Sequence, residues 1–366
     1  MRIELIKRPQ RSFVFSLLSP FIALALTMIA GAIMFSLLGK NPLTALYYYF
    51  IDPLRAVWQL HELAIKAAPL IFIGVGLAVS FRSNNWNIGA EGQFIAGAIA
   101  GSILPVLYPE LEFWWVLPLM LVMGFAGGAA YGAIPAVLKA RFNTNEILTS
   151  LMLVYVAQLF LDWIVRGPWR DPKGYNFPQT ISFGDAATMP ELMPMAGRAN
   201  WGFALAILVA VVLWFVMERT LKGFEVKVLG QSPRAGRFAG FSSRRMVFFA
   251  FLLSGGLAGL AGINEVSGAI GRLQPVISPG YGFTAIIVAF LGRLNPVGVI
   301  FAALLLALTY LGGEAAQTSL QLSDKVVRAF QGILLFFVLA CDTLILYRIR
   351  LVRTRGAARE VSDGHA

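Results

Sequence analysis

The stretch SNNWNIGAEGQFIAGAIAG, residues 83–101, places polar groups directly before a run of small apolar residues. Its polar side chains include one carboxylate and four amides: Glu91, Asn84, Asn85, Asn87 and Gln93. In a membrane, such groups are tolerated where they are buried in protein or line a water-filled cavity. The stretch therefore predicts an intramembrane polar site, provided that the surrounding chain crosses a membrane.

Composition and hydropathy predict that the chain does so. The 366 residues are 58% hydrophobic and 13% charged, with a mean hydropathy of +0.72, whereas soluble domains are about 25% charged. The apolar residues form runs close to the ~20 residues that a membrane-spanning helix needs. Cys341 is the single cysteine, and only His61 and His365 could join it in a zinc cluster. We therefore expect neither an internal disulfide nor a metal site.

The apolar runs predict an all-α, polytopic membrane protein with about ten transmembrane helices. The candidate spans are residues 13–38, 58–79, 93–107, 113–138, 147–165, 201–216, 246–263, 283–291, 297–312 and 326–346. The third and the eighth are short or broken by Gly and Pro, so eight to ten spans are expected. A transmembrane domain is thus predicted at 13–346, between an N-terminal segment, 1–12, and a basic tail, 347–366.

Charge predicts the orientation of the chain. An even number of spans puts both termini on one side, and most of the 30 Lys and Arg residues fall in segments on that side. Since Lys and Arg collect in cytoplasmic loops, both termini are expected to be cytoplasmic. The net charge of +11 then reflects basic segments that face an anionic lipid leaflet. The interleaved aromatic and basic residues of an RNA-binding surface are absent, so no nucleic-acid partner is expected.

Two loops are longer than a simple connection requires. The predicted outer loop, 166–200, is rich in Pro and Gly and contains Trp169 and Tyr175, which suits either a docking surface or a plain connection. The predicted cytoplasmic loop, 218–245, alternates cations with glycine, alanine and aromatic residues in short helical pieces. Apolar residues framed by charge favour contact with another protein, and a basic linker along the membrane is the alternative.

Four separated blocks resemble a known family. They are NIGAEGQFIAGA (87–98), NTNEILTSLMLVYVA (143–157), RTLKGFEVKVLGQSPRAGRFAG (219–240) and GYGFTAIIVAFLGRLNPVGVIFAALLLA (280–307). They are similar to the permeases of bacterial ABC importers in the simple-sugar and branched-chain amino-acid group, especially the nucleoside-importer branch. The resemblance implies a type II-like permease of the bacterial plasma (inner) membrane that imports a nucleoside. A simple sugar or another small polar solute is the alternative substrate.

The resemblance also implies partners. A second permease, a cytoplasmic ATPase and an extracytoplasmic substrate-binding protein are expected. The cytoplasmic loop would contact the ATPase, because a groove on that partner could bury the aromatics while acidic groups on its rim meet the cations. Gly223 and Gly230 are expected at turns. The candidate coupling residues are Arg219, Lys222, Gly223, Phe224, Gly230, Arg234, Arg237 and Phe238.

The chain lacks the phosphate-binding loop of an ATPase. Because GxxxxGK[ST] does not occur, we expect no cofactor in this chain and ATP on the partner. LLSGGLAG, residues 252–259, mimics an ABC ATPase signature, but it lies in an apolar span. Gly255 and Gly259 there have the GxxxG spacing of closely packed helices. The same spacing relates further glycines: Gly97 with Gly101, Gly124 with Gly128, and Gly128 with Gly132.

Polar residues near span ends are candidates for the translocation path. They are Asn87, Glu91, Gln93, Asn264 and Asn295. A local role for Glu91 stays open, either pairing with a cation such as Arg82 or capping the third helix. Asn264 and Glu265 are expected to close the seventh span.

Two other polar positions suggest local roles. RFNTNEILTS predicts a helix that begins with Asn143 or Thr144 near its cap and Glu146 in its first turn. Lys66 lies deep within a predicted span, so it either reaches outward or pairs in the interior.

Rival functions are disfavoured by the positions of the ionisable residues. A secondary transporter or channel would need carboxylates near the midplane, whereas the glutamates in and beside the spans fall near span ends. A membrane enzyme would need converging His, Asp or Cys residues, and two histidines with one cysteine assemble no such catalytic set. The expected function is therefore transport by alternating access, without enzymatic activity in this chain.

Overall fold

The computed structural model describes residues 2–7, 13–193 and 197–352. It divides into two compact units, one formed by Met1–Leu46 with Leu322–Ala366 and the other by Tyr47–Gln321. The chain passes from the first unit to the second within α2 (Pro42–Phe50), a helix that the apolar runs did not predict. Each unit is described by itself below.

The first unit is a helix pair with a short strand pair. α1 (Phe13–Leu37) packs along α14 (Asp324–Leu346), with the rings of Phe35 and Phe330 5.6 Å apart. β1 (Arg2–Lys7) pairs antiparallel with β2 (Tyr347–Val352), so the two ends of the chain meet in a two-stranded ladder. The all-α prediction missed this ladder, although the fold is otherwise helical. Residues 1, 8–12 and 353–366 of the predicted N-terminal segment and basic tail lie outside the described residues.

The second unit contains the other helices. They are η1 (Asp52–Leu54), α3 (Val57–Arg82), α4 (Ala90–Gly101), α5 (Ile103–Leu107), α6 (Val116–Phe142), α7 (Glu146–Arg166), η2 (Asp185–Ala187), α8 (Trp201–Arg219), α9 (Leu221–Gln231), α10 (Pro233–Phe238), α11 (Ser243–Glu265), η3 (Val266–Ile270), α12 (Tyr281–Leu291) and α13 (Pro296–Leu320). Each predicted apolar run contains a helix. α11 ends at Glu265, but the span that was predicted to close there continues through η3 to Ile270. Among the described residues, η3 is a single π-helical turn that continues α11.

Six helices in the described part are long and apolar enough to cross a membrane: α3, α6, α7, α8, α11 with η3, and α13. α4 has 12 residues and stops at Ser102, and α12 has 11. The third and eighth runs are therefore short or broken, as predicted, while a total of eight to ten spans stays a prediction. The apolar windows of α3 and α11 are 83% and 78% buried, against 28% for α7 and α8, so α3 and α11 form the centre of the unit.

Glycine lets three helices approach closely. A Cβ on Gly97 of α4 would meet the backbone of Gly259 in α11, and one on Gly128 of α6 would meet Gly255 and Gly259. Bare backbones keep van der Waals contact where side chains would separate the helices. The predicted GxxxG packing is confirmed, and the ATPase-like stretch 252–259 belongs to this helix contact.

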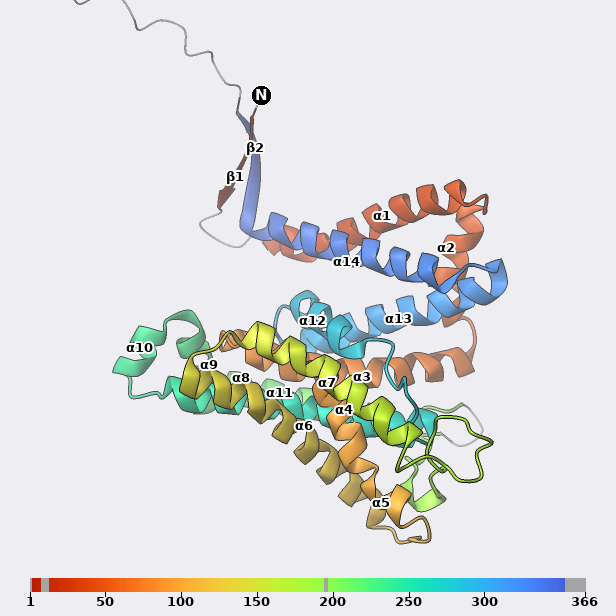
Figure 1. Cartoon of the computed structure of the whole chain (residues 1–366). Helices are drawn as coiled ribbons and strands as arrows, with labels where there is room; N and C mark the ends of the chain where they lie inside the picture. The colour runs from red at the N-terminus through yellow and green to blue at the C-terminus, as the bar shows by residue number, and fades with distance from the viewer. Residues whose placement is uncertain (1, 8–12, 194–196, 353–366) are drawn as a thin grey trace, which may run out of the picture. The chain divides into compact units, whose positions relative to one another are not determined.

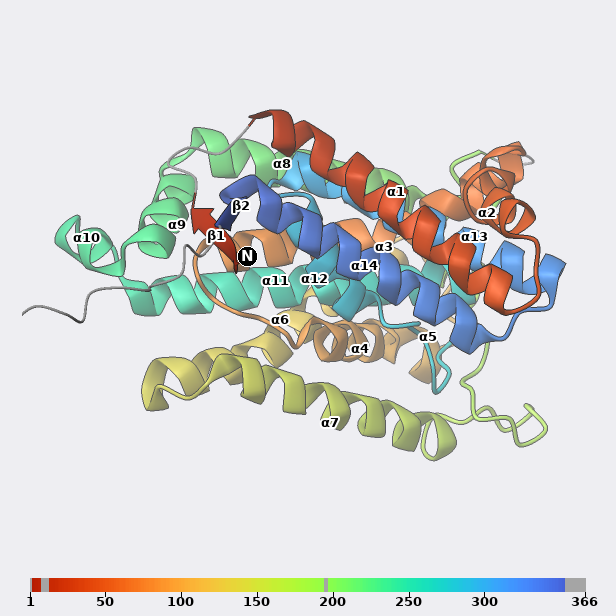
Figure 2. The ribbon, with the colours of Figure 1, turned by 90° about the horizontal axis from the view of Figure 1, so that it is seen from above.

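The two long loops lie at opposite ends of the second unit. Figure 1 shows α9 and α10 at one end, called the α10 end below, and the loop between α7 and α8 at the other, called the loop end. The predicted topology requires this separation, because it places the two loops on opposite sides of the membrane. In Figure 2, α7 runs along one edge of the unit beside α4 and α6. Its outer face is apolar and exposed, including Leu159 at 72% and Trp163 at 59%.

Candidate functional site

The polar stretch that precedes α4 folds into a buried network. The Asn87 and Gln93 amides bond reciprocally, Nδ2 to Oε1 at 2.7 Å and Nε2 to Oδ1 at 3.0 Å. Asn87 Nδ2 also donates to Ser254 Oγ of α11 at 2.8 Å. Asn87 is fully buried and Gln93 is 1% exposed. The network thus satisfies costly polar groups between α4 and α11, because buried amides need hydrogen-bond partners.

Glu91 connects α4 to α12 rather than to a cation. Its Oε2 accepts a hydrogen bond of 2.6 Å from the backbone N–H of Gly282, and its side chain also bonds with Ser278. Gly282 is the second residue of α12, whose N-terminal N–H groups lack partners within that helix. The carboxylate therefore caps a different helix from the one predicted. The predicted pairing with Arg82 is wrong, because Arg82 bonds to Glu218 at 3.2 Å.

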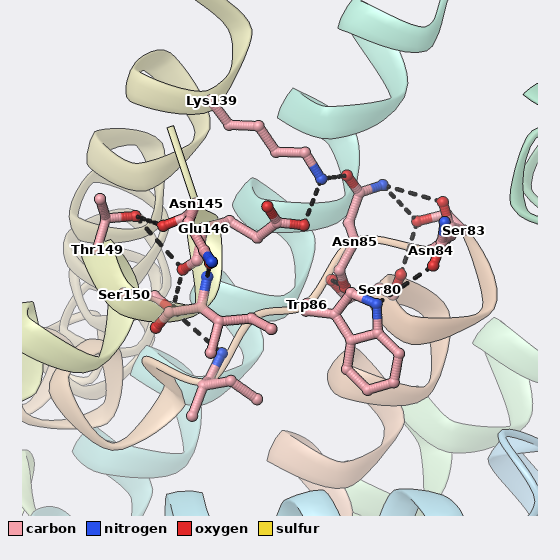
Figure 3. A network of polar contacts seen from close by, with 12 residues as sticks. Ser80, Ser83, Asn84, Asn85, Trp86, Lys139, Asn145, Glu146, Thr149 and Ser150 are labelled. Carbon is pink, nitrogen blue, oxygen red and sulfur yellow. Dashed lines mark hydrogen bonds and ion pairs between the residues drawn. The ribbon is translucent and has the colours of Figure 1, made fainter. Parts of the chain in front are cut away.

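A second network fixes the start of α7 (Figure 3). Lys139 Nζ, at the end of α6, bonds to Asn85 Oδ1 at 2.9 Å and forms an ion pair with Glu146 in the first turn of α7. The cap of α7 is Asn145, whose side chain accepts the N–H groups of Ile147 and Leu148. Glu146 lies in the first turn, as predicted, but the cap is Asn145 and not Asn143 or Thr144. Asn143 is left-handed, with φ 53°, and ends α6.

A cavity of about 580 Å³ lies at the loop end, where α3, the α7–α8 loop, η3 and α12 meet. Its lining combines four carboxylates and two cations with hydroxyl and apolar side chains. The lining residues include Glu62, Ile65, Lys66, Asp185, Thr188, Met189, Arg198, Glu265, Ser267 and Tyr281. Its volume lies within the range of about 300–1,000 Å³ that is usual for small-molecule sites.

Two ion pairs account for both cations of this cavity. Lys66 Nζ lies 2.7 Å from Glu314 Oε1 of α13, so Lys66 is paired, although the Glu314 side chain is 58% exposed. Arg198, from the α7–α8 loop, bonds to Glu62 Oε1 through Nε at 3.1 Å and through Nη2 at 2.9 Å. In the described part of the chain, Asp185, Glu191 and Glu265 form no ion pair. The cavity is therefore richer in hydrogen-bond acceptors than its ion pairs can use.

The backbone of the α7–α8 loop is joined to the chain that follows α11. Thr180, Phe183 and Met189 donate N–H groups to the carbonyls of Leu273, Gly271 and Ser267, at 3.0, 2.8 and 2.9 Å. These bonds, with the Arg198–Glu62 pair, attach the loop to helix ends. Residues 180–189 of the loop are thus held against the chain that follows α11, and Asp185, Thr188 and Met189 form part of the cavity wall.

Comparison with known proteins identifies the family. The model of the permease component of branched-chain amino acid transport systems matches residues 59–339, from α3 to α14. The chain belongs to this family. The glucose ABC transporter permease protein TsgB13 of Haloferax volcanii is 34% identical over the full length of both chains.

Two further relatives are permeases of nucleoside systems. The nucleoside ABC transporter permease protein NupB of Lactococcus lactis is 28% identical over 88% of this chain and 90% of its own. The guanosine ABC transporter permease protein NupP of Bacillus subtilis is 30% identical over 93% of this chain and 98% of its own. The protein is thus a multi-pass membrane permease of the ABC transporter type.

At the α10 end, the permease folds part of its predicted coupling loop into its own core. Val226 and Leu229 of α9 pack with Val79, Met217 and Met246, from α3, α8 and α11. Because those two residues are buried, they need no partner protein. This packing connects α9 directly to three long helices.

Several cations of this loop also have partners within the permease. Lys222 pairs with Glu225 at 2.8 Å and lies 4.7 Å from the ring centre of Phe249, and Lys227 pairs with Glu218 at 2.8 Å. Arg219 is exposed at the end of α8. The charged face offered to a partner is therefore smaller than the sequence indicates.

Gly223 and Gly230 lie within α9, so their predicted place at turns is wrong. A Cβ on Gly223 would meet the carbonyl of Met217, and a Cβ on Gly230 would meet the carbonyl of Arg82. Both glycines are required by close approach of α9 to the ends of α8 and α3, not by left-handed backbone.

The exposed remainder of the loop is compact and basic. Phe238 is 94% exposed and, with Arg234 and Arg237, lines a hollow of about 360 Å³ on α10. Phe224 is 55% exposed and meets Phe241 edge to face, with ring centres 6.1 Å apart. Large exposed aromatics beside cations are typical of a protein-contact surface.

The predicted path residues do not form one cluster. Asn87 and Gln93 are joined, Glu91 caps α12, and Asn295 caps α13 by accepting from the N–H of Val297 at 3.0 Å. Asn264, 2% exposed, packs against Gly202 of α8. Sequence reasoning missed the loop-end cavity and its lining residues Glu62, Asp185, Arg198 and Ser267. The charged residues of the long outer loop were the feature of the sequence that could have indicated this cavity.

Proposed function

We propose that this permease is the transmembrane subunit of an ATP-driven, binding-protein-dependent importer of nucleosides. The observation that carries the proposal is that two permeases of nucleoside systems align along 88% and 93% of this chain. In this proposal, the permease lies in a bacterial plasma membrane with both termini in the cytoplasm. The α10 end is then cytoplasmic and the loop end faces outward.

The proposed protein partners bind at the α10 end and at the loop end of the second unit. A cytoplasmic ATPase binds the exposed Arg234, Arg237 and Phe238 of α10, and a binding protein delivers the solute at the loop end. A second permease completes the path. ATP binding and hydrolysis belong to the ATPase, since the chain has no GxxxxGK[ST] loop and is proposed to hold no cofactor.

Transport proceeds by alternating access in this proposal. Movement of the ATPase displaces α9, and α9 transmits the displacement to α3, α8 and α11 through its buried contacts. Asn87, Glu91, Gln93, Asn264 and Asn295 remain the proposed polar positions along the path. The Glu91–Gly282 bond couples α4 to α12, so these helices would move together.

A sugar importer is the second candidate. The observation that favours it is the glucose permease relative, 34% identical over its whole length. Nucleosides and sugars share a ring with adjacent hydroxyls, so one path could accept either class.

Uptake by the assembled transporter tests the proposal. The permease would be produced with its ATPase, second permease and binding protein in host cells that lack their own nucleoside and glucose uptake, and labelled uridine and glucose would be supplied separately. We expect ATP-dependent accumulation of uridine and none with a hydrolysis-deficient ATPase. Accumulation of glucose alone would select the sugar importer, and accumulation of neither would contradict both candidates.

A further inference from the structure

The loop-end cavity holds buried polar atoms that the fold leaves without partners. Glu265 is 8% exposed and Ser267 is 2% exposed, yet neither Glu265 Oε2 nor Ser267 Oγ has a hydrogen-bond partner among the described residues. Both residues line the cavity. Leaving a buried polar group unpaired is costly, so two unpaired groups on residues that line one cavity point to a ligand there.

We propose that this cavity is a hydroxyl-binding subsite within a single permease chain, in which Glu265 and Ser267 bind adjacent hydroxyls of the sugar ring of the substrate. The inference rests on the proposed import of a nucleoside or sugar. It assigns the part of the substrate that is recognised and the residues that recognise it.

The local backbone brings the two side chains together. α11 ends at Glu265, and the chain continues through the π-helical turn η3, which contains Ser267. Such turns are uncommon and occur frequently at functional sites, because the extra residue changes the directions of neighbouring side chains. Met189 of the α7–α8 loop donates its N–H to the Ser267 carbonyl, which fixes the turn against the loop.

The charges around Glu265 favour a neutral ligand. Lys66 attracts the Glu265 charge and is itself bonded to Glu314 at 2.7 Å. A divalent cation would meet this ammonium group, and it requires about six or more oxygen ligands. No group of three or more acidic, His or Cys residues suited to a metal occurs in the described residues. An anion such as phosphate would meet the unpaired acidic groups of Asp185, Glu191 and Glu265.

Hydroxyl groups fit the remaining chemistry. An ionised carboxylate only accepts hydrogen bonds, while a serine hydroxyl both donates and accepts. Each ligand hydroxyl can donate to Glu265 and accept from Ser267 or Lys66, so a diol satisfies atoms on both sides. A nucleobase without its sugar supplies fewer hydrogen-bond donors than a nucleoside. Tyr281, which is 3% exposed, and Ile65 supply an apolar part of the cavity wall.

Saturation-transfer NMR on the full-length permease in nanodiscs tests the subsite, because it detects weak binding and reports which ligand protons lie nearest the protein. The probes are uridine, 2′,3′-dideoxyuridine and glucose, without a binding protein or ATPase. We expect saturation of uridine to be strongest on its ribose protons. For dideoxyuridine we expect about tenfold weaker binding, since hydrogen bonds to a charged group are lost.

Variants test whether Glu265 and Ser267 are the residues that bind the hydroxyls. Glu265→Gln and Ser267→Ala should each weaken uridine binding by about tenfold or less, whereas Glu265→Asp keeps a carboxylate and should retain part of the binding. Glu110→Gln, an exposed carboxylate outside the cavity, is the matched control. Size-exclusion profiles identify any variant that fails to fold, and the comparison of the two uridines on the natural chain needs no variant.

The outcomes separate the inference from the proposed function. Equal binding of uridine and dideoxyuridine, or unchanged binding by folded Glu265→Gln and Ser267→Ala, would overturn the subsite even where cells accumulate uridine. An absence of uridine saturation on the natural permease, with uptake intact, would overturn it as well. Failure of uptake for both solutes would contradict the proposed function instead.

Discussion

Lys66 of α3 and Glu314 of α13 form an ion pair of 2.7 Å in the second unit, although 248 positions separate them in the chain. The Lys66 side chain is 18% exposed and that of Glu314 is 58% exposed. Lys66 also attracts the charged form of Glu265, which lines the loop-end cavity. The pair thus joins two long helices, and its Lys66 side chain lines the cavity.

Removing the Lys66 side-chain charge should therefore destabilise the fold more than removing the Glu314 charge. We expect Lys66→Met to lower the free energy of unfolding by about 1–3 kcal/mol, because it breaks the pair with Glu314 and also removes the attraction of Lys66 for the buried Glu265. Glu314→Gln should cost about 1 kcal/mol or less, since that carboxylate is largely exposed. Thermal unfolding of the purified permease measures both. Equal losses for the two variants would show that Glu265 does not depend on Lys66.

The glycine contact of α4, α6 and α11 should be intolerant of a single methyl group. Gly259→Ala places a Cβ against Gly124 and Gly128, so the helices must move apart. We expect this to lower the free energy of unfolding by about 1–3 kcal/mol. Gly332→Ala in α14 is the matched control, because nothing lies within 4 Å of its Cβ position and alanine favours a helix. The yield of monodisperse permease and its melting temperature report the difference. Similar values for both variants would contradict the close packing.

Phe238 should act on the partner ATPase without affecting the fold of the permease. Because Phe238 is 94% exposed, Phe238→Asp should leave permease abundance unchanged but reduce co-purification of the ATPase and substrate-stimulated ATP hydrolysis severalfold. Tyr175→Asp, at an aromatic 93% exposed in the opposite loop, is the control and should retain co-purification of the ATPase. Leu229→Asp, at a residue 4% exposed, should lower abundance itself. Normal assembly and uptake by Phe238→Asp would exclude α10 as the coupling surface.

The orientation of the two ends can be read by thiol labelling. In a Cys341→Ser background, Tyr175→Cys should react with a membrane-impermeant maleimide in intact cells, whereas Phe238→Cys should react only after permeabilisation. The reason is that Lys and Arg concentrate in the segments around α9 and α10, which places that end in the cytoplasm. Reaction of both positions from the same side would contradict the predicted topology.

Local patterns account for what could be predicted from the sequence. Every apolar run contains a helix, because length and hydropathy are properties of the run itself. The end of α11 at Glu265 and the break at Asn295 before Pro296 follow from polar and helix-breaking residues, and the glycine spacing predicted close packing without naming the partner helices. The cap of α7 was misplaced by two residues at most, since Asn143, Thr144 and Asn145 all suit a cap and backbone geometry chooses among them.

The helical membrane character of this chain and its resemblance to the permease family could be recognised from the sequence alone, because hydrophobic runs and short blocks of residues are local features. Which polar groups meet depends on the packing of the helices. Glu91 bonds to Gly282, 191 positions away, and Lys66 to Glu314, because each partner is chosen by helix packing and not by spacing along the chain. The same packing left Glu265 and Ser267 facing one cavity without partners in the described residues. Burial makes those contacts strong enough to matter, and burial exists only once the helices are assembled.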